Sequence, residues 1–193
     1  MKTEFAFASI LCTLLFGSGC AATTAQSLRA DAEVVRKEST PEVLLHKGDA
    51  FAAVGDSTRA EQYFAAALAA GGNAQLLVRR LIRVCVADQR YRAALAYAED
   101  YLRNHPQDYQ IRFARATLAA GVGEIEIARE DLNLLVRATP NNPDVHFALA
   151  VLLRDEFRDL PLARAHFATY MKLAPRGANT EQARAYSTDE AIQ

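Results

Sequence analysis

The chain has 193 residues, which is long enough for one domain with a sizeable core. Its 22 basic and 23 acidic residues give a net charge of -1 with no block of like charge, which argues against nucleic acid binding through a broad basic field. Hydrophobic residues make up 51% of the chain, Trp is absent, and Ala is abundant in residues 51–70 and 112–120. This composition favours closely packed helices, so we expect an all-α domain.

The N-terminal segment has the pattern of a targeting signal. Residues 5–16 are apolar apart from Ser and Thr, but a membrane span needs roughly 20 such residues. The small residues 17–19 follow, and Cys20 comes next. This resembles the lipobox of bacterial lipoproteins, in which the chain is cut just before an acylated cysteine. The resemblance implies a lipoprotein signal peptide at residues 1–19 and lipid attachment at Cys20. An ordinary signal cleaved after Gly19 or later, and an apolar N-terminus on a cytosolic protein, are the alternatives.

Membrane attachment would depend on the acyl chains. Removing the signal peptide takes away Lys2 and Glu4, so the net charge stays at -1 and offers no electrostatic anchor. Acyl chains on Cys20 would supply about 0.8 kcal/mol per buried methylene. Ala21 is not the Asp that retains lipoproteins in the inner membrane in the best known sorting systems. The resemblance therefore implies the periplasmic face of the outer membrane of a Gram-negative bacterium.

A tether and a single remaining cysteine follow from the same assignment. Residues 20–40 start with small and polar side chains without an apolar period, which predicts a flexible tether with at most a marginal helix at 28–38. Cys12 would leave with the signal and Cys20 would carry lipid. Cys85 is then unable to form an internal disulfide, and its place in the repeat pattern predicts that it lies on a core face.

Four columns of residues recur through the rest of the chain at spacings of 34, 34 and 35 residues. Each repeat unit has a terminating Gly or Pro, a small residue at the start of its second half, and two further positions in step. Proline cannot continue a helix, and alanine lets two helices cross closely. The columns are Gly72, Pro106, Pro140, Pro175; Ala60, Ala94, Ala128, Ala163; Phe64, Ala98, Leu132, Phe167; and Ala67, Tyr101, Leu135, Tyr170.

This pattern resembles the tetratricopeptide repeat, two antiparallel helices per 34 residues. The resemblance implies an all-α superhelical solenoid of about four helix-turn-helix repeats plus a C-terminal capping helix. Its expected parts are repeats at 41–74, 75–108, 109–142 and 143–177, then a capping helix and tail at 178–193. The third repeat departs from the pattern because Arg112 and Arg115 replace apolar residues. The fourth has an extra residue in its turn, around 157–161.

No constellation of catalytic or metal-binding residues is evident. The four histidines lie in different repeats or at helix ends, and the chain contains no HExxH, CxxC or GxSxG motif. We therefore expect no enzyme activity, no metal and no cofactor.

The family resemblance implies a concave surface made by the first helix of each repeat. Arg79 and Arg83 lie one turn apart, and beside Phe113 and Phe147 they predict a groove for a peptide with an apolar anchor and a carboxylate. Alternatively, the arginines are solvated or paired to Asp49 and the phenylalanines pack under a neighbouring helix. The positions carried over are Leu45, Asp49, Ala52, Arg79, Arg83, Val86, Phe113, Thr117, Ala120, Phe147, Val151 and Arg154.

The combination of anchor, tether and solenoid predicts a lipid-anchored, periplasm-facing scaffold. It would bind protein partners in an outer-membrane envelope machine such as a motility or secretion apparatus. One alternative is an assembly factor similar to the pilotin lipoproteins of type IV pilus secretins. Another is an adaptor that regulates a cell-wall enzyme.

Overall fold

A computed structural model describes residues 39–187 of the chain. The predicted signal peptide, Cys20 and the predicted tether up to residue 38 lie outside the described residues, as do the last six residues of the predicted tail. The described helices all belong to one unit of the chain, which begins at Thr40.

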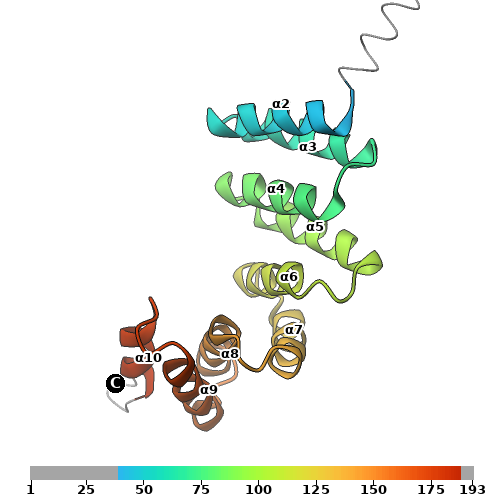
Figure 1. The fold of residues 1–193 in the computed structure, drawn as a ribbon. Coiled ribbons are helices and arrows are strands. Elements are labelled where there is room, and N and C mark those ends of the chain that lie inside the picture. The colour runs from blue at the N-terminus through green and yellow to red at the C-terminus, as the bar shows by residue number, and fades with distance from the viewer. Residues whose placement is uncertain (1–38, 188–193) are drawn as a thin grey trace, which may run out of the picture. The chain divides into compact units, whose positions relative to one another are not determined.

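The described residues form nine helices and no strand. Each helix packs against the next one in the chain, so that four antiparallel pairs follow one another and α10 packs on α9 (Figure 1). The predicted all-α fold of four helix-turn-helix units and a C-terminal helix is therefore confirmed. The helices are α2 (Pro41–Ala53), α3 (Ser57–Ala69), α4 (Ala74–Ala87), α5 (Tyr91–Asn104), α6 (Tyr109–Gly121), α7 (Ile125–Ala138), α8 (Pro143–Asp155), α9 (Leu160–Leu173) and α10 (Thr180–Ser187).

Short polar residues start most of these helices. An Asp, Asn or Thr side chain accepts a hydrogen bond from a backbone N–H of the first turn, which satisfies a donor that the helix itself leaves without a partner. The capping residues are Thr40, Asp56, Asn73, Asp108, Asn142 and Asp159.

The turn between the two helices of a pair has three residues in the first three pairs and four in the last pair. The fourth residue is the extra residue that the sequence predicts.

The predicted small-residue column lies where the helices of each pair cross. Ala60, Ala94 and Ala128 are fully buried, and Ala163 is 2% exposed. The bulkier residues of the same register, such as Phe64 and those that share its column, are buried beside them. Each helix pair thus buries the same positions of its repeat, which explains why all four columns keep the same spacing along the chain.

Gly48 of α2 faces the buried ring of Phe64, and we predict that Gly48→Ala destabilises the protein. A Cβ at Gly48 would lie 2.5 Å from Cε1 of Phe64. Alanine normally stabilises a helix by about 1 kcal/mol relative to glycine. Here overpacking reverses the sign, and we expect a loss of about 1–3 kcal/mol in the free energy of unfolding. Urea unfolding measures it.

Gly121 of α6 provides the control for this prediction. A Cβ at Gly121 would meet no atom within 4 Å, so Gly121→Ala should leave stability equal or slightly raised. If both substitutions raise the free energy of unfolding equally, the close approach of Gly48 to the Phe64 ring would be contradicted.

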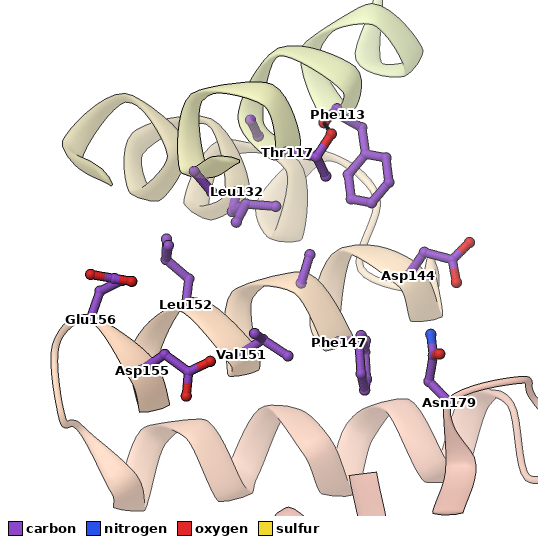
Figure 2. Close-up of a pocket in the computed structure, with 13 residues that line it drawn as sticks. Phe113, Thr117, Leu132, Asp144, Phe147, Val151, Leu152, Asp155, Glu156 and Asn179 are labelled. Carbon is purple, nitrogen blue, oxygen red and sulfur yellow. Dashed lines mark hydrogen bonds between the residues drawn. The ribbon is translucent and has the colours of Figure 1, made fainter. Parts of the chain in front are cut away.

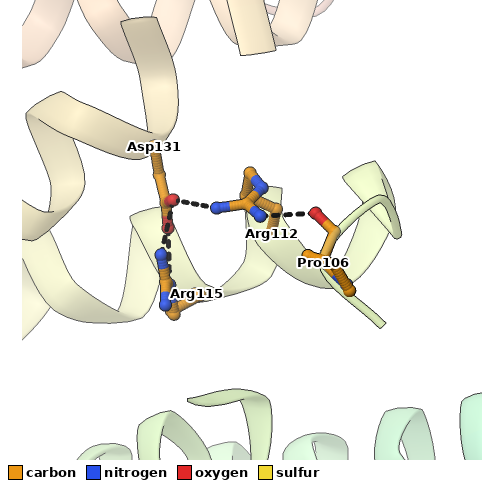
Figure 3. Close-up of polar contacts among 4 residues, drawn as sticks. All are labelled: Pro106, Arg112, Arg115 and Asp131. Atoms are coloured by element: carbon orange, nitrogen blue, oxygen red, sulfur yellow. Dashed lines mark hydrogen bonds and ion pairs between the residues drawn. The ribbon is translucent and has the colours of Figure 1, made fainter. Parts of the chain in front are cut away.

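A buried ion-pair cluster accounts for the departure of the third repeat from the pattern (Figure 3). Asp131 of α7 is only 2% exposed, and its carboxylate accepts from Arg112 at 2.7 Å and from Arg115 at 2.6 Å. Arg112 also donates to the backbone oxygen of Pro106. Two basic side chains at apolar positions of α6 are therefore compatible with the fold because one carboxylate of α7 faces both of them.

A second polar cluster joins α3, α4 and α5 around Glu61. Its carboxylate accepts from Tyr97 Oη at 2.9 Å, pairs with Arg90 at 2.6 Å and faces the Cys85 thiol at 3.6 Å. Cys85 is fully buried, as the repeat pattern predicts. Burial, and then the charge of Glu61, raise the pKa of this thiol to about 11. Cys85 is therefore a protonated core residue rather than a reactive thiolate.

Candidate functional site: an apolar cavity between α6 and α8

An open cavity of about 480 Å³ lies between α6 and α8 (Figure 2). Phe113 and Thr117 of α6 line one wall, and Phe147 and Val151 of α8 line the other. Leu132 of α7 also lines the cavity. The volume is within the range typical of small binding sites and most of the lining side chains are apolar, which makes this cavity a candidate ligand site.

The walls are held by packing beneath them. The Phe147 ring meets the buried Phe167 of α9 edge-on at 5.7 Å between centroids, and it lies 5.2 Å from the ring of Tyr170. The Thr117 hydroxyl donates within its own helix, to the carbonyl oxygens of Phe113 and Ala114. The cavity thus presents mainly carbon atoms on a preformed support.

Carboxylates stand at both ends of the cavity. Asp144 lies in the first turn of α8, while Asp155 and Glu156 lie at its last turn and C-cap. Asp155 is paired with Arg154, with contacts of 2.5 and 2.9 Å. Neither Asp144 nor Glu156 makes an ion pair with a described residue, and both are exposed. The charged rim of the cavity is therefore acidic.

A second cavity, also of about 480 Å³, lies on the other side of α6. It is lined by Ile82 and Val86 of α4 and by Tyr91 of α5, and it shares Thr117 with the first cavity. Val86 is 38% exposed and Tyr91 is 42% exposed. An apolar surface therefore continues from α4 across α6 to α8.

Comparison with known proteins identifies this arrangement of helix pairs. Residues 113–178 match the profile of the tetratricopeptide repeat. A tetratricopeptide repeat protein from Parabacteroides merdae superposes with a TM-score of 0.68 and 22% identity, over 76% of this chain and 58% of that one. The described residues have the tetratricopeptide repeat fold. The chain spans little more than half the length of that similar protein.

Two further solved structures share the tetratricopeptide repeat fold. MamA from Desulfovibrio magneticus has a TM-score of 0.64 and 24% identity, over 82% of this chain and 89% of that one. YrrB, described as a TPR protein with an unusual peptide-binding site, has a TM-score of 0.62 and 18% identity, over 84% of this chain and 86% of that one. At these identities the likeness establishes the fold.

The cavity brings together only the second half of the predicted groove. Phe113, Thr117, Phe147 and Val151 line it, and so does Ala120. Both phenylalanines are half-buried and also pack on the core, as the packing alternative expects, and peptide binding between them stays a prediction. These five positions come from the third and fourth tetratricopeptide repeats.

The remaining predicted groove residues lie elsewhere. Arg79 and Arg83 are exposed on α4, line neither cavity and make no ion pair with a described residue. The predicted arrangement of two arginines beside Phe113 and Phe147 is therefore absent from this cavity. Leu45 packs in the first repeat pair.

Two other predicted groove residues are held by internal contacts. Asp49 pairs with Arg80 at 2.9 Å rather than with the two exposed arginines of α4. Arg154 is paired with Asp155, and its guanidinium carbon lies 3.3 Å from the centroid of the Tyr186 ring of α10. Both charged groups therefore interact with neighbouring residues of this chain.

The acidic rim is the part of the site that the sequence pattern did not bring out. Asp144, Asp155 and Glu156 are not among the groove positions that the family resemblance implies. A signal for Asp144 does exist, because it precedes Phe147 by three residues and Val151 by seven, which places all three on one helix face.

No group of three or more His, Cys, Asp or Glu between residues 39 and 187 is placed to hold a metal ion. None of the helices in that range has the length and hydropathy of a membrane span.

Two histidines that lie 20 residues apart in the sequence are in contact near the N-terminal end of α8. Nδ1 of His146 lies 2.9 Å from Nδ1 of His166, and Nε2 of His146 lies 2.9 Å from the carbonyl oxygen of Pro140. The carbonyl can only accept, so neutral His146 donates from Nε2 and accepts at Nδ1 from His166.

We predict that this pair makes the protein less stable in mild acid. Burial and the neighbouring His146 lower the pKa of His166 from its ordinary 6.5. Below 6.5 the unfolded chain therefore binds more protons than the folded one, and the free energy of unfolding falls as the pH decreases. The Tm should drop between pH 7.5 and 5, and His166→Gln should flatten that dependence. An equal pH dependence in both proteins would contradict the assignment.

Proposed function

We propose that this protein is an interaction scaffold that holds a segment of a partner protein on the face formed by α4, α6 and α8. The observation that carries the proposal is the open apolar cavity walled by Phe113 and Phe147 within a tetratricopeptide repeat fold. Support comes also from YrrB, a protein of similar fold described as having a peptide-binding site. Burial of one large apolar side chain in the cavity would contribute roughly 1.5–3 kcal/mol.

We further propose that the scaffold is lipid-anchored through Cys20 on the periplasmic face of the outer membrane. The apolar segment 5–16, the small residues 17–19 and the cysteine that follows them support this proposal. The partners would then be components of an envelope machine for motility or secretion. The protein would act by bringing them together, without chemistry of its own.

Photo-crosslinking in living cells tests the binding face. A photoreactive residue at Thr117 lies between the two cavities, and Thr117 is exposed, so the substitution is compatible with folding. The control position is Asn133, which is exposed on α7 and lines neither cavity. We expect a discrete adduct from Thr117 and none from Asn133. Adducts from Asn133 alone would place the partner on another face and refute the proposal.

The identity of the crosslinked partner distinguishes three possible cellular roles of the scaffold. A secretin subunit would indicate the pilotin-like role, a cell-wall enzyme would indicate the adaptor role, and a motility component would indicate the machine scaffold.

Cys20→Ala should release the protein from the membrane. The mature sequence has a net charge of -1, so electrostatic attraction to an anionic membrane would not replace the lost acyl chains. Fractionation and immunoblotting measure the result, with Cys12→Ala as the control because it retains Cys20. Persistence of the Cys20→Ala variant in the membrane fraction would rule out the lipobox assignment.

A further inference from the structure

We propose that the cavity between α6 and α8 binds a cationic segment, an apolar anchor side chain flanked on both sides by Lys or Arg. This inference rests on the proposed function and specifies the partner of that same site. It differs from the sequence-based expectation of an anionic ligand held by arginines of α4.

The charge on the cavity rim is the first argument. Of the residues that line the cavity, Asp144, Asp155 and Glu156 are acidic and none is basic. The charge of Asp155 is matched by Arg154, which is itself fixed against the Tyr186 ring. Asp144 and Glu156 remain without an ion-pair partner among the described residues, so the rim carries two charges available to a ligand.

The ends of α8 reinforce this pattern unequally. Asp144 sits at the N-terminal end, where the positive end of the helix dipole partly offsets its negative charge. Glu156 sits at the C-terminal end, where the carbonyl ends of the helix add to its negative potential. A cation is therefore favoured most strongly beside Glu156, and an anionic segment would meet like charge at both ends.

The spacing of the two free carboxylates sets the length of the motif. Asp144 in α8 and Glu156 at its C-cap are twelve positions apart, which corresponds to about 18 Å along the helix axis. An extended segment covers that distance in about five or six residues, and a helical one in about twelve. Between the two ends lie Phe147 and Val151, which contact the anchor.

The test uses the full-length protein with the photoreactive residue at Thr117. Mass spectrometry maps the partner segment in the adduct, and a synthetic peptide copied from that segment is titrated against the purified full-length chain. We expect an apolar residue with Lys or Arg on both sides within the stated spacing. We expect binding to weaken as salt is raised.

Charge-removing variants supply the quantitative test. The double variant Asp144→Asn with Glu156→Gln should bind the peptide about 2- to 30-fold more weakly, the range for loss of two exposed ion pairs. Glu42→Gln is the matched control, because Glu42 is an exposed carboxylate in the first turn of a helix that also begins with Pro and lies outside the cavity. It should bind as the parent does. All three substitutions are at exposed positions, and thermal melting verifies their folding.

The outcomes separate this inference from the proposal beneath it. An adduct whose mapped segment is acidic or uncharged, or a double variant with unchanged affinity, overturns the cationic specificity and leaves the scaffold function standing. Absence of any adduct from Thr117 overturns both.

Discussion

Replacement of Asp131 by Ala is expected to lower the free energy of unfolding by about 3–5 kcal/mol, because it leaves two buried guanidinium groups without their carboxylate. The Arg112 and Arg115 side chains are 11% and 22% exposed, so water reaches them poorly. The Nε of Arg112 already lacks a hydrogen-bond partner among residues 39–187. Chemical denaturation followed by circular dichroism measures the loss.

Two controls distinguish a buried charge from a general sensitivity of the repeat. Asp100→Ala removes an ion pair with Arg103 that is exposed on α5, and it should change stability little. A triple variant, Arg112→Met, Arg115→Met and Asp131→Leu, replaces the whole cluster by apolar side chains. It should recover most of the loss, since a well-packed apolar replacement of a buried ion cluster is often neutral or stabilising. If Asp131→Ala were as stable as the parent protein, the cluster would not be buried.

Replacement of Phe167 by Ala is expected to cost about 3–5 kcal/mol, the range for truncating a buried aromatic side chain. Phe167 is fully buried, and the centroid of its ring lies 5.7 Å from that of Phe147 and 5.6 Å from that of Tyr186. The substitution therefore loosens α10 and removes the support of one cavity wall. Thermal unfolding measures the first effect, and crosslinking from Thr117 at a temperature where the variant is folded measures the second.

Phe167→Leu is the control for the cavity effect. It keeps most of the apolar volume and should cost less than about 1.5 kcal/mol. The adduct from Thr117 should persist in this variant. Equal melting temperatures for Phe167→Ala and the parent protein would contradict the packing of α9 under the cavity.

Features that repeat along the chain were predictable because each residue of a column has the same neighbours in its own repeat. The burial of Ala94 and of Phe64, the core position of Cys85 and the longer turn of the last helix pair all follow from one register. The predicted groove positions of the third and fourth repeats lie together for the same reason.

Features that depend on pairing between helices were not predictable in this way. Asp131 is 16 residues from Arg115, and only the packing of α7 on α6 brings them together. Asp49 of α2 pairs with Arg80 of α4 rather than with Arg79 or Arg83 of the same helix. Which of the three arginines faces Asp49 depends on the rotation of α4 against α2.

The sequence by itself determined the periodic part of this protein: the 34-residue register, the small residues at the crossings and the aromatic positions of the third and fourth repeats. These depend on local propensity and on contacts within one repeat, which recur. The tertiary structure decided the sign of charge at the cavity and the partner of each buried or half-buried charged group. Those depend on which side chains of neighbouring helices face one another, because electrostatic contacts require atoms within a few ångström and no periodicity of one helix fixes that distance.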